Sequence, residues 1–181
     1  EPLDQTLQKS IYNLQVKLKD LGLTEVQTYS FYSTAVLEAL GFTSDNLKQL
    51  VKIANPISSE TEYLRADLWP NLVEVIGKNL KKGFKDIAIF EIGKVYMPGP
   101  KEEYRLAMAL MNNTDNPLEE LAALSQSVST HPKGVKLNPA FFHPKRFLEG
   151  GLAEIHPKFL NKLGISKRVA ILEIDLEPLL G

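Results

Sequence analysis

The sequence contains no cysteine and no apolar run close to the length of a membrane span. The absence of cysteine excludes disulfides, zinc–thiolate sites and cysteine nucleophiles, and it permits a cytoplasmic location. A membrane-spanning helix needs about 20 consecutive apolar residues, so we expect no membrane partner. The charges are nearly balanced, with 21 basic and 22 acidic side chains. The total charge therefore does not favour wrapping of nucleic acid by the chain as a whole.

Several short motifs of catalysis and cofactor binding are also missing. The phosphate-binding pattern GxxxxGK[ST], the dinucleotide fingerprint GxGxxG and a serine nucleophile elbow do not occur. The three histidines, His131, His143 and His156, each precede a proline and share no metal-ligand spacing. We interpret them as markers of turns and helix starts, and we predict no metal site.

The chain has 181 residues, of which 44% are hydrophobic and 24% charged, as expected for a single globular domain. Strand patterns occur in neighbouring pairs, whereas helical patterns are unevenly spread, so we predict an α+β fold with a mainly antiparallel sheet. Residues 112–136 are the least patterned part. We expect strands at 26–32, 86–95, 104–111, 135–137 and 169–176, helices at 4–21, 34–40, 44–51, 68–83, 118–124 and 156–163, and a loop at 125–133.

The N-terminal helix carries a narrow apolar stripe with spacings of four and three residues. Asp4 is placed to cap its start, and Gly22 to end it in a left-handed conformation. The stripe packs either on the chain's own core or, in addition, on a partner subunit, with Tyr12 and Val16 widening the apolar surface. The candidate interface residues are Leu7, Ile11, Tyr12, Leu14, Val16 and Leu18, and Leu21 completes the stripe.

Four carboxylates, Glu91, Glu154, Glu173 and Asp175, lie on predicted strands. Paired carboxylates can perform acid–base catalysis or hold magnesium, but they also occur on the solvent face of a half-covered sheet or as partners of cations such as Arg65 and Lys94. Arg65 lies between two apolar runs, so we predict that it is structural, with Glu91 as its first expected partner.

Two further features concern the segment from residue 68 to residue 85. Trp69 and Pro70 open its helix, because proline suits the first turn, where its missing N–H costs nothing.

Four lysines surround the end of this helix. They form either a solvated helix end or a contact for an RNA backbone. These lysines are Lys78, Lys81, Lys82 and Lys85.

Several segments in a fixed order carry a resemblance to a known family. They are Gly22–Phe31 (GLTEVQTYSF), Asn55–Leu72 (NPISSETEYLRADLWPNL), Ile89–Tyr96 (IFEIGKVY), Phe142–Arg146 (FHPKR), Gly151–Pro157 (GLAEIHP) and Leu172–Leu176 (LEIDL). Together they span nearly the whole chain, which resembles the C-terminal catalytic-like module of the bacterial phenylalanyl-tRNA synthetase β subunit. The stretches 113–118 and 145–151 are shorter than this family implies.

The resemblance implies a class II synthetase core, an antiparallel sheet flanked by helices. Such cores hold the ATP α-phosphate with an arginine just after the strand that here reads FEIGKVY, and this sequence has Met97 there. The family's third motif ends in an arginine that holds the γ-phosphate, and Pro178 stands at that position. Neither side chain offers the charged, forked donors of a guanidinium. The resemblance therefore implies a pseudo-catalytic module without catalytic, cofactor-binding or metal-binding residues.

The function implied is a structural module, residues 1–181, cut from a longer β subunit. It would dock that subunit on the catalytic α subunit of a heterotetramer, which attaches phenylalanine to its tRNA in the cytoplasm with ATP and magnesium. Partners would be the α subunit and, through the intact enzyme, tRNA. The alternatives are a free-standing class II-like ligase or regulatory paralogue that binds an acid and a nucleotide, and an RNA-contacting module.

Overall fold

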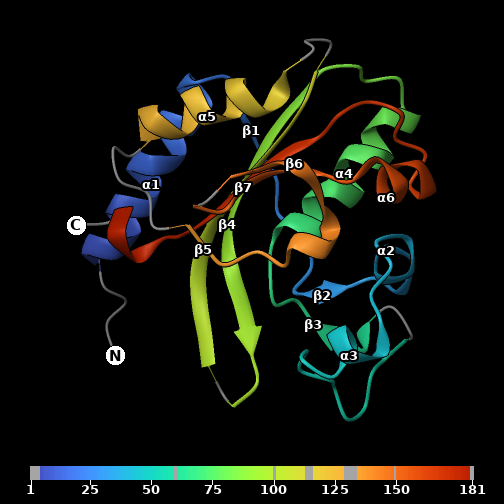
Figure 1. The fold of residues 1–181 in the computed structure, drawn as a ribbon. Helices are drawn as coiled ribbons and strands as arrows, with labels where there is room; N and C mark the ends of the chain where they lie inside the picture. The colour runs from blue at the N-terminus through green and yellow to red at the C-terminus, as the bar shows by residue number, and fades with distance from the viewer. Residues whose placement is uncertain are drawn as a thin grey trace.

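A six-stranded sheet forms the centre of the computed structural model, which describes residues 5–58, 61–99, 101–112, 116–128, 134–148 and 150–179 (Figure 1). All neighbouring strands are antiparallel except the first pair, which is parallel. The predicted α+β fold with a mainly antiparallel sheet is therefore confirmed. In spatial order the strands are β1 (Thr24–Glu25), β4 (Ile87–Met97), β5 (Lys101–Met111), β8 (Ala170–Asp175), β7 (Leu152–Ile155) and β6 (Phe142–Leu148).

Helices cover both faces of this sheet (Figure 1). Helices α1 (Gln5–Asp20) and α5 (Pro117–Val128) pack on one face, and α4 (Trp69–Lys81) packs on the other with α2 (Thr34–Ala39) and α6 (Pro157–Lys162). Successive side chains of β5 therefore enter two different cores: Leu106 and Met108 pack toward α1 and α5, whereas Ala107 and Ala109 pack toward α4. This double burial explains why the central strands are nearly continuous apolar runs.

A second, two-stranded sheet pairs β2 (Phe31–Tyr32) with β3 (Tyr63–Leu64), close to the short helix α3 (Ser44–Leu47). The predicted strand at 26–32 is regular only at its end, Phe31–Tyr32, because residues 26–30 cross from the edge of the large sheet to the small one. Backbone bonds hold this crossing at Val26 and Ser30, and side chains hold it in between. The N–H of Thr28 donates to Glu91 Oε1 at 3.2 Å, and Asn71 Nδ2 donates to the carbonyl oxygen of Tyr29 at 2.9 Å.

Glycine in the left-handed region ends helices α1 and α4. Gly22 has φ of +89° and Gly83 has φ of +93°. In α4, the N–H of Gly83 bonds to the carbonyl oxygen of Leu80 at 3.0 Å, and that of Phe84 to Asn79 at 3.2 Å. These two bonds define a Schellman motif, which satisfies carbonyl groups that the helix leaves open. The predicted end at Gly22 is confirmed, whereas Asp4 lies outside the described residues.

The remaining differences concern short or weakly patterned segments. The helix predicted at 44–51 is regular only over α3. Residues 125–128, predicted as the start of a loop, belong to helix α5, which extends to Val128; residues 129–133 lie outside the described part of the chain. Residues 135–137 form no strand, and only Gly134 bridges Ile174. Short 3-10 helices occupy Pro139–Phe141 and Glu177–Leu179. No described helix is long and apolar enough to cross a bilayer.

Candidate functional site

Arg65, just after β3, lies buried against the sheet beside Glu91 of β4. Its Nη1 is 2.7 Å from Glu91 Oε1 and 2.8 Å from Thr28 Oγ1, and its Nε donates to the carbonyl oxygen of Lys94 at 2.8 Å. Thr28 Oγ1 donates in turn to Glu91 Oε2 at 2.7 Å. The structure thus brings Arg65 and Glu91 together and ties the 26–30 crossing to the large sheet.

Gly93 provides the space for this guanidinium. A β-carbon added at Gly93 would collide with Arg65 Nη2. The ladder between β4 and β5 continues without a shift through Gly93 and its partner Arg105. Gly93 therefore forms no bulge in the strand, and it serves the close packing of Arg65 instead.

Glu173 of β8 forms a second cluster at the start of α4. Its carboxylate accepts hydrogen bonds from the backbone N–H groups of Leu68 and Trp69, each at 3.0 Å, and lies 3.0 Å from Arg105 Nη1. Arg105 Nη1 is also 2.7 Å from Asp67 Oδ1. No side chain of α4 itself caps this helix. Glu173 supplies the acceptor oxygens for N–H groups that the first turn of a helix leaves open.

The environment of Glu173 changes its acidity. The side chain is fully buried, and burial raises the pKa of the Glu173 carboxyl to about 7, with the charge of Asp67 adding to the rise and Arg105 opposing it. Burial likewise raises the pKa of Asp67, against the lowering effect of Arg105. Two carboxyls that share one arginine therefore resist carrying two negative charges.

Glu154 of β7 is the third buried carboxylate on the sheet. It pairs with Arg146 at 3.1 Å and with Arg168, whose Nε donates at 2.9 Å. The interpretation of the strand carboxylates as a solvent face is wrong for Glu91, Glu154 and Glu173, because helices cover both faces of the sheet; Asp175 is half-buried. Lys94 pairs with Glu102 of β5 instead.

These ion pairs occupy the buried carboxylates of the sheet. Each of the three glutamates is bound by at least one guanidinium, which competes with any cation for the carboxylate oxygens. Among the described residues, no group of three or more histidine, cysteine, aspartate or glutamate side chains could hold a metal ion. The arrangement is suited to joining elements of the fold.

The positions expected to bind phosphate carry no cation. Met97 is the last residue of β4 and half-buried, and it lines a small cavity of about 250 Å³ together with Leu64 and Tyr96. Lys101 of β5 also lines this cavity, and its ammonium group is paired with Glu103 at 2.7 Å. Pro178 lies in the 3-10 segment after β8. Trp69 and Pro70 are buried at the start of α4, where Trp69 packs on Phe142 with ring centroids 5.2 Å apart.

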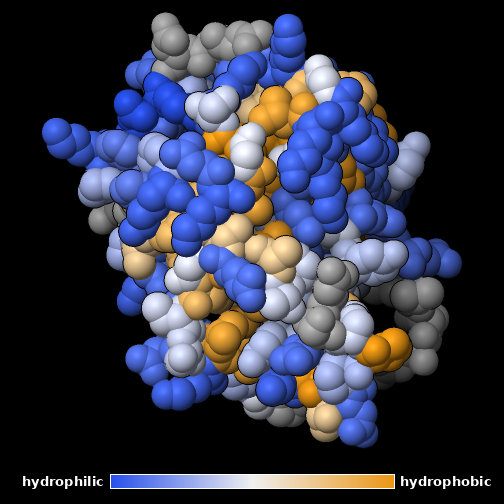
Figure 2. Space-filling model, turned by 90° about the vertical axis from the view of Figure 1, so that its right-hand side faces the viewer, coloured by the Kyte–Doolittle hydropathy of each residue, from blue (hydrophilic) through white to orange (hydrophobic). Residues whose placement is uncertain are grey.

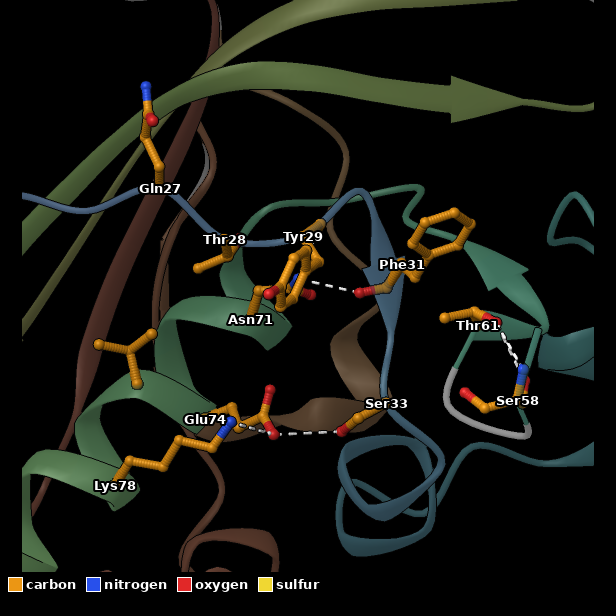
Figure 3. A pocket seen from close by; sticks show the side chains of 11 residues that line it. Gln27, Thr28, Tyr29, Phe31, Ser33, Ser58, Thr61, Asn71, Glu74 and Lys78 are labelled. Atoms are coloured by element: carbon orange, nitrogen blue, oxygen red, sulfur yellow. Dashed lines mark hydrogen bonds and ion pairs between the residues drawn. The ribbon is translucent and has the colours of Figure 1, made fainter. Parts of the chain in front are cut away.

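A cavity of about 480 Å³, which the sequence did not suggest, lies beside α4 and β2 (Figure 3). Three of its polar side chains bind one another: Glu74 Oε1 bonds to Ser33 Oγ at 3.2 Å and to Lys78 Nζ at 2.9 Å. Asn71 uses its Nδ2 to hold the carbonyl oxygens of Tyr29 and Phe31. No spacing in the sequence marks this cavity, because its lining comes from three separate segments.

The structure reduces the number of α1 residues that remain candidates for a subunit interface. Leu14 and Leu18 pack in the chain's own core, so their assignment to a subunit interface is wrong, and Ile11 packs partly on the same core. Leu7 is half-buried. Tyr12 and Val16 stay exposed, by 64% and 39%. Their place in an interface stays a prediction.

We expect Arg65→Ala to lower the free energy of unfolding by about 3–5 kcal/mol, because it leaves Glu91 charged, buried and without its cation. Urea denaturation followed by circular dichroism measures this loss. Arg146→Ala is the matched control, since Arg146 is partly exposed and Glu154 keeps Arg168. An equal loss in both variants would contradict a special role for Arg65.

The raised pKa of Glu173 predicts a pH dependence of stability. The folded chain holds the Glu173 proton more tightly than the unfolded chain does. The stability that this protonation contributes is therefore fully present below the ordinary pKa of 4.5 and is lost as pH rises through about 7. The expected loss is about 3 kcal/mol. Glu173→Gln should flatten this decline in urea titrations between pH 4.5 and 8, whereas Glu119→Gln, at an exposed position of α5, should leave the decline unchanged. A parent chain with no decline would refute the assignment.

Comparisons with known proteins agree with this architecture. The family model described as the phenylalanyl tRNA synthetase beta chain CLM domain matches residues 3–176. Phenylalanine–tRNA ligase β subunits of Syntrophus aciditrophicus and Moorella thermoacetica are 29% and 31% identical over 99% and 86% of this chain. The alignments cover 26% and 23% of those relatives, so the chain spans about a quarter of their length.

Solved structures show the same fold. Two structures of pyrrolysyl-tRNA synthetase from Desulfitobacterium hafniense superpose with TM-scores of 0.68 and 0.70 at 18% and 20% identity. Each covers 96% of this chain, and the chain covers 67% and 68% of them. The strand order, the helix positions and the family match over nearly the whole length lead to one conclusion: the chain belongs to the catalytic-like (CLM) domain family of phenylalanyl-tRNA synthetase β chains.

Proposed function

We propose that this chain is a non-catalytic module of phenylalanine–tRNA ligase that docks the β subunit on the catalytic α subunit. The observation that carries this proposal is that Met97 and Pro178, where the resemblance places phosphate-binding arginines, carry no cation, in a synthetase-like core whose buried carboxylates are already paired with guanidinium groups. A class II core needs donors for the charge that develops on ATP phosphates. Without them, the fold keeps its shape and can serve assembly.

In this proposal, residues 1–181 are one module of a longer β subunit in a cytoplasmic heterotetramer. The intact enzyme would use ATP and magnesium to attach phenylalanine to tRNA, with the chemistry located in the α subunit. The relatives are phenylalanine–tRNA ligase β subunits of which the match covers about a quarter, which supports a place for this chain as one module of a longer β subunit.

The outer side of α1 and the adjacent sheet edge form the proposed docking surface. Tyr12 and Val16 are exposed on α1, and β1 is the edge strand of the large sheet. Glu25 of β1 is held by Gln15 at 2.6 Å and by Lys19 at 2.7 Å, so helix and edge form one continuous surface. An edge strand with open backbone groups is a template for pairing with another chain.

We expect no amino-acid activation by this chain alone. Pyrophosphate exchange with phenylalanine and ATP should stay at background, because no cation stands at Met97. The control is Met97→Glu, which would repel phosphate. Exchange that survives purification in the parent chain and disappears in Met97→Glu would contradict the pseudo-catalytic assignment and favour a free-standing ligase; equal traces in both indicate contamination.

We expect Tyr12→Glu/Val16→Glu to weaken binding to the α subunit at least tenfold, because two carboxylates would have to be desolvated in the interface. Co-elution on size-exclusion chromatography and titration calorimetry measure this effect, after circular dichroism shows an unchanged fold. The matched control is Tyr104→Glu/Leu148→Glu, which changes two similarly exposed side chains elsewhere. If the first variant binds α as tightly as the parent, α1 is not part of the interface.

A further inference from the structure

The C-terminal end of α4 differs from the other glycine-terminated helix ends in one respect. The residue after the glycine usually packs its apolar side chain back on the helix or core. Leu23 after α1 and Ile165 after α6 are buried in this way, and Phe42 after α2 packs on the core. Phe84, after Gly83, is instead 57% exposed although its N–H makes the expected bond to the carbonyl of Asn79. The motif forms without burial of this ring.

Exposed lysines lie close to Phe84 along the chain. Lys81, Lys82 and Lys85 are its sequence neighbours and are all exposed. They are accompanied by one carboxylate in the same segment, Asp86, and their exposure leaves the ammonium groups accessible to a large polyanion. The balanced charge of the whole chain therefore conceals a local excess of positive charge here.

The tertiary structure adds two more lysines from a distant part of the chain. The turn after α6 packs against the end of α4: Lys167 Nζ donates to the carbonyl oxygen of Lys85 at 2.9 Å, and Lys81 Cε lies 3.9 Å from where a β-carbon on Gly164 would stand. Lys162, in the last turn of α6, is exposed beside this turn. The α4 end and α6 lie side by side in Figure 1.

The surface around these two helices is mixed in character. Figure 2 views the molecule from the side on which α4 and α6 lie, and it shows hydrophilic side chains next to smaller areas of exposed apolar atoms. Lys78, one turn earlier on α4, is held by Glu74 at 2.9 Å. Lys78 therefore contributes less positive charge to this surface than Lys81, Lys82 and Lys85 later in the same segment.

We propose that Phe84 and the surrounding lysines, Lys81, Lys82, Lys85, Lys162 and Lys167, form an RNA-contacting surface of this module. The lysines pair with phosphates of the backbone, and the ring of Phe84 stacks on an unpaired base, a combination that binds single-stranded segments with little sequence preference. An acidic protein would satisfy the lysines but would have no use for a flat ring between them. The inference rests on the proposed function only in its choice of tRNA as the natural partner.

The test uses the full 181-residue chain and an in vitro transcript of a phenylalanine tRNA, with binding measured by fluorescence anisotropy between 50 and 200 mM salt. We expect Lys81→Gln/Lys82→Gln/Lys85→Gln to weaken binding at least tenfold and to reduce the salt slope by up to about three. Phe84→Ala should weaken binding at least fivefold, and Phe84→Tyr should keep it, since tyrosine also stacks.

Matched controls separate a site from general charge. Lys9→Gln/Lys48→Gln/Lys101→Gln removes the same charge from other exposed positions, and Tyr104→Ala removes another exposed ring; both should bind tRNA like the parent. The inference is overturned if the control triple variant loses as much affinity, if Phe84→Ala binds like the parent, or if polyglutamate competes as well as RNA. Because α-subunit binding is measured without RNA, loss of this inference leaves the docking proposal intact.

Discussion

The contact between Glu173 and the start of α4 is the interaction on which the rest of the structure depends. A central strand provides the carboxylate, and the helix provides two backbone N–H groups that its own side chains leave open. Arg105 from the neighbouring strand offsets the charge. Because this contact places α4 over the sheet, it also places Trp69 among the aromatic side chains that fill that face.

Buried arginine–carboxylate pairs recur at other joints of the fold. Arg65 and Glu91 connect the crossing between the two sheets to β4, and Glu154 connects β7 to Arg146 and Arg168. Such pairs add little net stability compared with apolar packing, but they are costly to break and accept few alternative geometries. They therefore specify how the elements fit together. They also keep these carboxylates bound to guanidinium groups.

The long, strongly patterned elements could be predicted from the sequence. β4, β5, β8 and α4 each show a continuous apolar run or a helical face with a proline start, and the structure has all four close to the expected bounds. The segment 26–32 was misleading, because its β-branched and aromatic residues favour a strand while side chains of Glu91 and Asn71 hold its backbone elsewhere. Propensity is a local quantity, and these competing bonds come from residues more than 40 positions away.

The sequence by itself determined the α+β class and the family, since these depend on residue identity and order along the chain. Tertiary structure alone decided which carboxylates are buried, that Leu14 and Leu18 belong to the core, and that Lys167, in the segment after α6, binds the backbone at the end of α4. The physical reason is that burial and charge pairing depend on which surfaces meet. Residues that are far apart along the chain, such as Leu68 and Glu173, acquire their roles only when the sheet and its helices are assembled.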